Sequence, residues 1–398
     1  MNGSPLKRTI SILFVLGMAK VSWCESWGSI PFIENPLAGS RVFSEKRCLE
    51  CHVVRGIGEA FGPDLTQIGQ KMDFFELAGA LWSHSPRMIE VMMGKNIPRP
   101  ILSPSEIEEL FSFLYFLGSF EESGDHNKGD EIFSRKGCRQ CHSLGKTKND
   151  PLDKVGRYVS PIYIATELWN HSPTISPSMR SPSFAPMEMS HLLAYIRAES
   201  WNPSGEVLYL QPGNPRQGQE VFREKHCSVC HGEAGQGLKQ SHLRKGLTEI
   251  VGLMWNHSYK MWEEMKRRGL KIPRFTTEEM ADLVTFLYFL PLYGERGDAK
   301  KGEQAFISKG CASCHIQDAT EKNKGIDLGE ASHLTIFELV SAAWNHVPEM
   351  ERMTTELGLL WPRFEKDELK NLLSYIQSLK RRTMRGGNPP RSEREGDD

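Results

Sequence analysis

A five-residue pattern, Cys-x-x-Cys-His, occurs four times in this chain of 398 residues. Its first cysteines are 84 to 90 residues apart, so each copy has room for one small domain. In such a pattern the two thiols form thioethers with the vinyl groups of a porphyrin, and the adjacent imidazole binds the iron. The expected attachment residues are Cys48, Cys51, Cys138, Cys141, Cys227, Cys230, Cys311 and Cys314, and the expected proximal iron ligands are His52, His142, His231 and His315. The pattern therefore predicts four c-type haems.

The residues that precede each copy favour haem over zinc. A single Cys-x-x-Cys-His could also be half of a zinc site. Here every copy has a glycine nine residues and a phenylalanine five residues before its first cysteine, at Gly39, Gly129, Gly218 and Gly302 and at Phe43, Phe133, Phe222 and Phe306. Positions four apart share one face of a helix, where the glycine lets another backbone cross closely and the phenylalanine packs against the porphyrin edge.

The period predicts four tandem domains, at residues 37–125, 126–212, 213–297 and 298–382, and the helical segments of each repeat favour an all-α chain. A domain of this length has little core of its own, and a buried porphyrin would supply much of the missing apolar area. The linkers are short between repeats 1 and 2 and between repeats 3 and 4, and longer in the middle. We therefore expect two pairs of domains that follow the order of the sequence.

Both ends of the chain lie outside the repeats. Residues 1–26 resemble an export signal peptide, because Lys7 and Arg8 precede an apolar run that is too short to span a bilayer; an uncleaved interfacial anchor is the alternative. Export would place the protein in the periplasm or elsewhere outside the cytoplasmic membrane. Residues 383–398 are rich in glycine, proline and charge and are expected to be disordered. The net charge of −1 gives no reason to expect a nucleic-acid partner.

The last predicted helix of each repeat carries an aromatic residue, namely Phe113, Tyr195, Phe286 and Tyr375. Together with the Gly/Phe helix, this pattern resembles class I cytochrome c, in which the first helix crosses a last, aromatic-bearing helix beside the haem. The resemblance covers nearly all of residues 37–382 as four copies. It implies that the segment Gly62-Pro63-Asp64-Leu65 lies on the proximal side of the first haem, whereas the other repeats lack that segment.

The spacing leaves two sets of candidates for the sixth ligand of each iron. Many members of that family supply a methionine just before a proline ahead of the last helix, but here those positions hold Ile97, Ala185, Ile272 and Trp361. Instead, every repeat has a Trp-x-His segment, which ends at His84, His171, His257 and His346, and a methionine seven or eight residues later, at Met92, Met179, Met265 and Met353. These offsets share a helical face, so either set could bind the iron. Mixed or open coordination is the third alternative. Thioether ligation would raise the reduction potential.

Six-coordinate haems have no vacant position for a substrate, so they pass single electrons, and four of them on one chain predict an electron relay rather than an enzyme. The expected partners are redox proteins. The chain would serve them either as a soluble shuttle or as a subunit of a membrane-bound respiratory complex. The alternative is a haem peroxidase, a small-oxide reductase or a gas or redox sensor, each of which needs one open iron site. The sequence fixes neither the donor and acceptor nor the oligomeric state.

Overall fold

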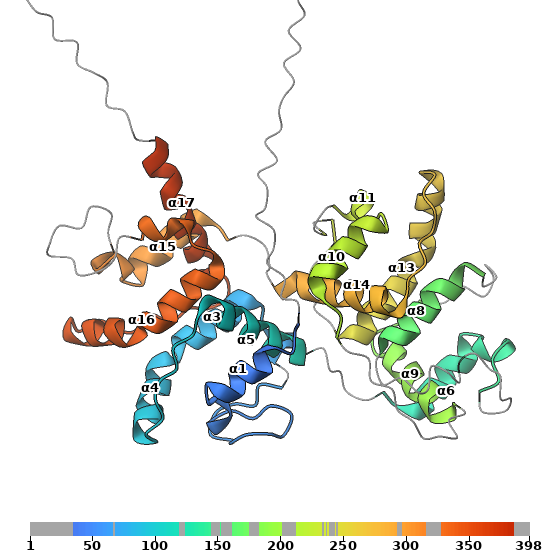
Figure 1. The fold of residues 1–398 in the computed structure, drawn as a ribbon, viewed down its shortest axis with the longest axis horizontal. Coiled ribbons are helices and arrows are strands. Elements are labelled where there is room, and N and C mark those ends of the chain that lie inside the picture. Colours follow the sequence, from blue (N-terminus) through green and yellow to red (C-terminus); the bar gives the residue numbers. More distant parts are fainter. Residues whose placement is uncertain are drawn as a thin grey trace, which may run out of the picture. The chain divides into compact units, whose positions relative to one another are not determined.

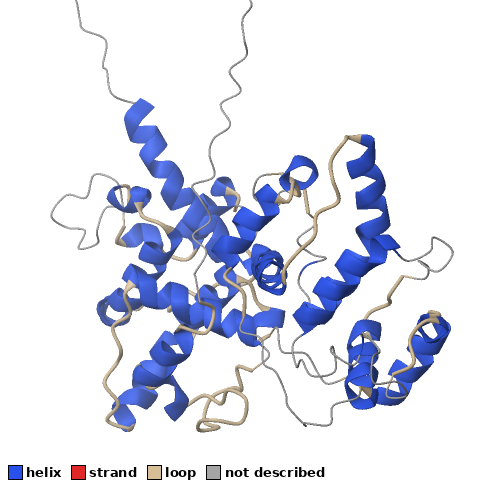
Figure 2. Ribbon diagram, turned by 45° about the vertical axis from the view of Figure 1, so that its right-hand side comes forward, coloured by secondary structure: helices blue, strands red, loops and turns tan. Residues whose placement is uncertain are grey.

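The computed structural model describes residues 35–385, with gaps at 67, 119–123, 145–151, 153–160, 175–182, 201–211, 233–234, 236, 239–242, 244–245, 293–296 and 316–327. Within these ranges the chain forms helices and loops and no strand, which confirms the all-α expectation (Figure 2). No helix in this part of the chain combines the length and apolar character needed to cross a bilayer. The predicted signal peptide at 1–26 lies outside the described residues.

Each repeat is built on two crossing helices, its first and its last (Figure 1). These pairs are α1 (Gly39–Glu45) with α5 (Pro104–Leu117), α6 (His126–Arg135) with α9 (Glu188–Glu199), α10 (Pro215–Glu224) with α14 (Thr277–Phe289), and α15 (Ala299–Ser308) with α17 (Glu368–Arg385). Helix α17 extends three residues beyond the expected boundary at 382, and residues 386–398 of the predicted tail are not described.

The predicted glycine is where the two helices cross. A Cβ atom added to Gly39 would lie 2.0 Å from the carbonyl oxygen of Glu109, so no larger residue fits there. A Cβ atom added at the equivalent glycine would also lie close to a carbonyl oxygen of the last helix in the other repeats. The distances are 2.1 Å from Gly129 to His191, 2.0 Å from Gly218 to Asp282 and 2.0 Å from Gly302 to Asn371. The close crossing expected from the sequence is thus present in all four repeats.

The predicted phenylalanine lies one turn further along and contacts the aromatic residue of the last helix. Ring centroids are 6.1 Å apart for Phe43 and Phe113, 5.3 Å for Phe133 and Tyr195, 5.3 Å for Phe222 and Phe286, and 5.4 Å for Phe306 and Tyr375. Rings at these separations stabilise a core beyond the apolar area that they bury. This aromatic pair joins the two helices on the side that carries the attachment motif.

The Trp-x-His segments lie on the middle helices. These are α3 (Phe74–Ser83) and α4 (Ser85–Gly94) in repeat 1, α8 (Pro161–His171) in repeat 2, α13 (Leu247–Arg267) in repeat 3 and α16 (Ile336–Glu356) in repeat 4. In repeat 4 a proline follows the histidine without ending the helix: Pro348 lies inside α16, which continues for eight residues to Glu356.

The repeats do not pair in sequence order. Helix α16 of repeat 4 packs against α4 and α5 of repeat 1, and α17 packs against α3. In the same way α8 of repeat 2 packs against α13 and α14 of repeat 3. The expectation that short linkers would pair repeat 1 with 2 and repeat 3 with 4 is therefore wrong. A short linker limits separation, but it does not provide an apolar face on which a neighbour can dock.

Repeats 1 and 3 also meet, at the C-terminal ends of α5 and α14. The Tyr288 hydroxyl donates a hydrogen bond to the carbonyl oxygen of Tyr115 at 2.7 Å, and both side chains are buried. Beside them, the rings of Phe116 and Phe289 stack with centroids 6.4 Å apart. The contacts among the described residues therefore connect the repeats in the order 2, 3, 1, 4.

Candidate haem-binding sites

The four attachment motifs share one local backbone geometry. The residue before the first cysteine has a left-handed conformation in every repeat, with φ of 63° at Arg47, 80° at Gly137, 65° at His226 and 80° at Gly310. The chain then makes one tight turn, in which the histidine N–H donates to the carbonyl of the first cysteine at 2.9 to 3.0 Å, as from His52 to Cys48. Each turn places two thiols and one imidazole together, as the sequence predicted.

The first thiol of each motif lies against protein atoms. Burial raises the pKa of Cys48 to about 12 and the pKa values of Cys227 and Cys311 to about 11, and it raises the pKa of Cys138 as well. None of the eight motif cysteines is in a disulfide. The donor set is therefore the one that thioether attachment of a porphyrin needs.

The segment Gly62–Leu65 lies on the proximal histidine, as the resemblance implied. The Nδ1 atom of His52 donates to the carbonyl oxygen of Pro63 at 3.0 Å, which leaves Nε2 as the nitrogen available to a metal. A Cβ on Gly62 would lie 2.6 Å from Cε1 of the His52 ring, so only glycine allows this approach. The sequence did not predict that Gly237 takes a similar place in repeat 3, where its N–H donates to the carbonyl of His231 at 2.8 Å.

In repeats 1, 2 and 3 the histidine of the Trp-x-His segment lies near the proximal histidine of its own repeat. In repeat 2 the ring centroids of His142 and His171 are 6.3 Å apart, with planes inclined by 69°. Two imidazoles bound to one metal through nitrogen, at about 2 Å each, have ring centres about 6 Å apart. The separation of the two rings therefore matches that of two imidazoles on one metal.

The same two histidines are neighbours in repeats 1 and 3. Burial lowers the pKa of His84, and the nearby His52 lowers it further. A hydrogen bond from the Nδ1 atom of His84 to the carbonyl of Ala80 acts in the opposite direction. Burial also lowers the pKa of His231, and His257 lowers it further. The lowered pKa values favour the neutral form of His84 and of His231, which is the form that binds metals.

The methionine candidates have different surroundings. Met92 and Met265 are each only 9% exposed and lie in the last turns of α4 and α13. Met353 is half-buried in α16, and Met179 lies outside the described residues.

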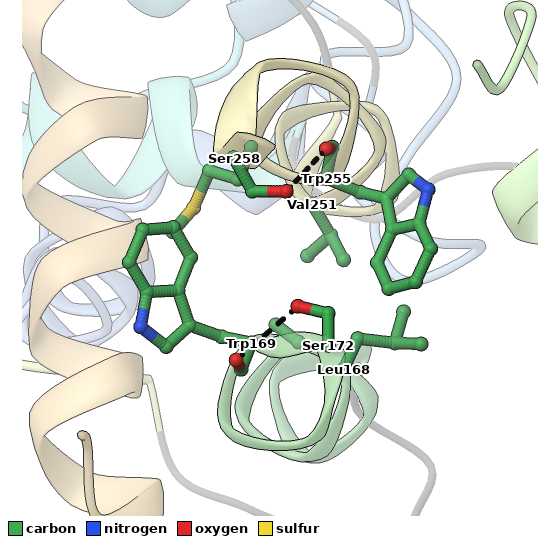
Figure 3. Close-up of a pocket in the computed structure, with 8 residues that line it drawn as sticks. Leu168, Trp169, Ser172, Val251, Trp255 and Ser258 are labelled. Carbon is green, nitrogen blue, oxygen red and sulfur yellow. Dashed lines mark hydrogen bonds between the residues drawn. The ribbon is translucent and has the colours of Figure 1, made fainter. Parts of the chain in front are cut away.

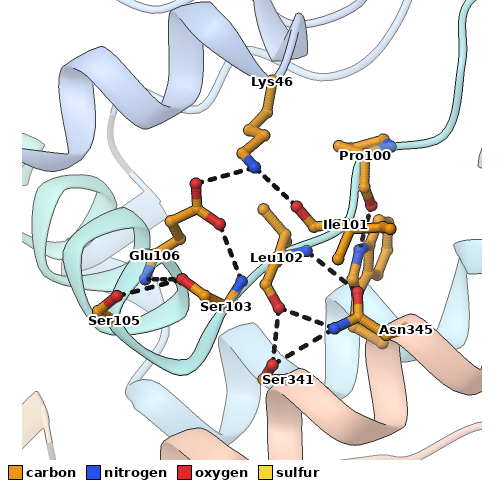
Figure 4. A network of polar contacts seen from close by, with 10 residues as sticks. Lys46, Pro100, Ile101, Leu102, Ser103, Ser105, Glu106, Ser341 and Asn345 are labelled. Atoms are coloured by element: carbon orange, nitrogen blue, oxygen red, sulfur yellow. Dashed lines mark hydrogen bonds and ion pairs between the residues drawn. The ribbon is translucent and has the colours of Figure 1, made fainter.

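A recurring ion pair, which the sequence reasoning missed, connects each attachment motif to the last helix. The lysine two residues before the first cysteine pairs with a glutamate at the start of that helix. The pairs are Lys46 with Glu106 at 2.8 Å, Lys136 with Glu188 at 2.9 Å, Lys225 with Glu279 at 2.7 Å and Lys309 with Glu368 at 2.8 Å. In repeat 1 the glutamate also caps the helix by accepting from the Ser103 N–H (Figure 4). The constant offset from the cysteine was visible in the sequence.

The same lysines correct the alignment of the proline segments. Each lysine also donates to the carbonyl of Ile101, Ser183, Arg274 or Arg363, at 2.7 to 3.0 Å. Each acceptor directly follows a proline, so the equivalent prolines are Pro100, Pro182, Pro273 and Pro362. The alignments through Ile97 in repeat 1 and Ala185 in repeat 2 were wrong. The residues directly before the aligned prolines are Arg99 and Ser181 in these two repeats, and Ile272 and Trp361 in the other two. None of them is a methionine.

The tryptophan of the Trp-x-His segment docks one repeat onto another. Its indole N–H donates to the carbonyl of the proline in the paired repeat, from Trp82 to Pro362 at 2.8 Å, from Trp344 to Pro100 at 2.9 Å and from Trp169 to Pro273 at 2.8 Å. Trp255 instead packs its ring against Phe184 of repeat 2, with centroids 6.1 Å apart. The tryptophan of every segment thus contacts the paired repeat.

The residue between the tryptophan and the histidine has a docking role as well. Asn345 donates to the carbonyl of Leu102 at 2.8 Å and accepts from its N–H at 3.0 Å (Figure 4). Asn170 binds Phe275 and Asn256 binds Phe184 in the same two-way manner, while Ser83 in repeat 1 accepts from the N–H of Phe364 at 3.1 Å. The first two positions of each segment thus bind the paired repeat.

The middle helices of repeats 2 and 3 face each other across a small hollow (Figure 3). Ser172 donates to the carbonyl of Trp169 at 3.3 Å, and Ser258 donates to that of Trp255 at 2.8 Å, so both hydroxyls are satisfied by their own segment. The other lining residues include Leu168 and Val251. This is an interface between repeats, with no group that marks it as a binding site.

Comparison with known proteins agrees with this geometry. The family model described as Cytochrome c matches residues 37–117, 215–290 and 299–380, which is more than half of the chain. The protein belongs to the cytochrome c family, and its domains bind covalently attached c-type haem. No curated protein and no solved structure matches the chain. The matched stretches are repeats 1, 3 and 4, so repeat 2 is assigned on its own geometry.

Proposed function

We propose that the chain carries four c-type haems and passes single electrons between redox partner proteins outside the cytoplasmic membrane. The observation that carries the proposal is repeat 2, which the family model does not match. It has the left-handed Gly137, the close crossing at Gly129 and the contact between Phe133 and Tyr195. It also has the Lys136–Glu188 ion pair. A degenerate domain that had lost its haem would have no reason to retain all four features.

The roles of the protein groups follow from their places in each turn. The two cysteines of each motif would hold the porphyrin, and the proximal histidines His52, His142, His231 and His315 would bind the iron. The haem, when bound, supplies one-electron chemistry between the ferric and ferrous states. The crossing helices and their aromatic pair would shield one edge of the group from water and help to fix its orientation.

The contacts between repeats support a route that differs from the sequence order. Repeat 4 meets repeat 1 through Trp344 and Asn345, repeat 1 meets repeat 3 through Tyr115 and Tyr288, and repeat 3 meets repeat 2 along α13 and α8. We infer that electrons move through the repeats in the order 4, 1, 3, 2 or its reverse. Repeats 2 and 4 are then the ends at which external partners bind. A membrane-bound respiratory complex and a soluble redox protein are both compatible with that arrangement.

The haem count is tested by intact mass. The full chain would be produced in a host that attaches c-type haem, and the added mass measured for the wild type and for a Cys138→Ser, Cys141→Ser variant. We expect four haems in the wild type and three in the variant. Three in both proteins would contradict the proposal, because repeat 2 would then be empty.

Carbon monoxide separates the relay from a haem enzyme or a gas sensor. A relay with six-coordinate haems should bind none in the reduced state. Binding of one carbon monoxide per chain would contradict a closed relay and would favour an enzyme or sensor with one open iron.

A further inference from the structure

We propose that the histidine of each Trp-x-His segment, rather than a methionine, is the sixth ligand of the haem iron. The four residues are His84, His171, His257 and His346. This assignment rests on the proposed attachment of four haems, and it specifies the ligand opposite each proximal histidine.

The first support is the distance between the rings. The 6.3 Å between the His142 and His171 centroids is the separation that two imidazoles on one iron require. In repeat 1 the Nδ1 atoms of both His52 and His84 bind backbone carbonyls, so each ring keeps Nε2 for the metal. A backbone partner on one nitrogen is how proteins usually orient a metal-binding imidazole.

The second support is the register of the helices. Each middle helix of repeats 1, 3 and 4 ends two residues before a left-handed residue: Asn96 with φ of 53°, Gly269 with 73° and Gly358 with 66°. The N–H of the next residue then donates back at 2.8 Å, from Ile97 to Met92, from Leu270 to Met265 and from Leu359 to Thr354. These bonds align the three helix ends without reference to the side chains.

In that alignment the histidines coincide and the methionines do not. His84, His257 and His346 each lie twelve residues before the left-handed residue. Met92 and Met265 lie four residues before it, but Thr354 occupies that place in repeat 4 and Met353 is one residue away. A shift of one residue turns a side chain by about 100° around the helix. The methionines therefore do not form one equivalent set of ligands.

The third support is the surroundings of the side chains. Met92 and Met265 are packed among protein atoms, whereas all four histidines retain solvent-accessible surface. The preceding tryptophan and asparagine or serine of the segment are engaged by the paired repeat, as Trp344 and Asn345 are by Pro100 and Leu102. Docking between repeats thus holds the helix that presents the histidine.

The ligand set decides the class of partner. Methionine raises the reduction potential of a cytochrome c haem relative to a second imidazole. Four haems with two histidines each would suit donors and acceptors that work at low potential.

The test is the near-infrared magnetic circular dichroism of the ferric holoprotein, in which histidine–histidine and histidine–methionine haems give charge-transfer bands at different wavelengths. We expect only the histidine–histidine band. The 69° between the ring planes also predicts a highly anisotropic low-spin electron paramagnetic resonance signal from repeat 2. A histidine–methionine band in the wild type would overturn the assignment for the haems that produce it.

Variants assign the ligand to individual repeats. We expect His171→Ala to open one iron, so that one carbon monoxide binds per chain, and His171→Met to convert one haem in four to the histidine–methionine type. Met265→Leu is the matched control and should leave the spectrum unchanged; loss of a methionine band in that variant would overturn the proposal. The haem number of each protein, from its intact mass, separates failure of ligation from failure of attachment.

Discussion

Lys136 and Glu188 form an ion pair, with 2.9 Å between Nζ and Oε2, that connects the second attachment motif to the first turn of α9. Lys136 also donates to the carbonyl of Ser183, so one ammonium group holds two parts of the repeat. The same contact recurs in all four repeats, although the residues around it differ. It keeps the haem turn beside the last helix, where the aromatic pair also lies.

The acid stability of repeat 2 should depend on Glu188. Burial alone would raise the pKa of Glu188, but hydrogen bonds from Lys136, Arg135 and a backbone amide lower it to about 2. Since the folded pKa lies below the ordinary value of 4.5, the stabilisation is complete above about pH 4.5 and is lost as the pH falls toward 2. We expect Glu188→Gln to cost about 1 kcal/mol at pH 7 and progressively less in acid. Thermal unfolding of both proteins between pH 7 and pH 3 measures this difference.

The control for Glu188 is an exposed ion pair. Glu220 binds Arg223 at 2.8 Å, and both side chains are more than 40% exposed. Glu220→Gln should therefore change the melting temperature little at any pH. A difference between Glu188→Gln and the wild type that stays constant from pH 7 to pH 3 would contradict the ion-pair account.

Asn345 should be the main polar determinant of docking between repeats 1 and 4. Its side chain satisfies both backbone groups of Leu102, which is 3% exposed. Asn345→Ala would leave those groups without that partner, at a cost of about 1 to 3 kcal/mol. We expect faster hydrogen exchange at the Leu102 amide, while the Phe275 amide, held by Asn170 in the other pair, stays protected. Equal protection of Leu102 in the variant and the wild type would contradict the docking role.

Gly310 should stabilise the protein through its backbone conformation alone. Its φ of 80° is left-handed, and a Cβ added there would meet no atom within 4 Å. Gly310→Ala should therefore destabilise the protein by about 1 to 2 kcal/mol through backbone strain. Gly94→Ala is the matched control, because Gly94 ends helix α4, is equally open and lacks a positive φ, so we expect no loss of stability. Denaturant unfolding measures both, and equal effects would show that the left-handed turn is not the cause.

Features that repeat at a fixed distance from the cysteines could be predicted from the sequence. The crossing at Gly218 and the contact between Phe222 and Phe286 are examples, because both depend on residues within one repeat. The pairing of repeats 1 and 4 could not be predicted, since it depends on how Trp344 and Asn345 meet Pro100 and Leu102 far along the chain.

The sequence pattern gave a wrong alignment where two nearby residues fitted it equally well. Repeat 1 has a proline at both 98 and 100, and only the hydrogen bond from Lys46 to Ile101 shows which one matches the other repeats. The choice between His84 and Met92 as the sixth iron ligand was also one that the local sequence could not make. The offset between these two residues places them on one helical face. Their positions can be compared between repeats only when the end of the helix is known, which the left-handed Asn96 marks in repeat 1. Sequence offsets from the cysteine alone do not contain that information.

The most direct test of the four-haem relay is a spectroelectrochemical titration of the holoprotein that counts electrons by coulometry. We predict four electrons per chain, all taken up at potentials below those of histidine–methionine cytochromes, with spectra that stay low-spin throughout. Three electrons per chain, or a ferrous high-spin spectrum at any stage, would contradict the account.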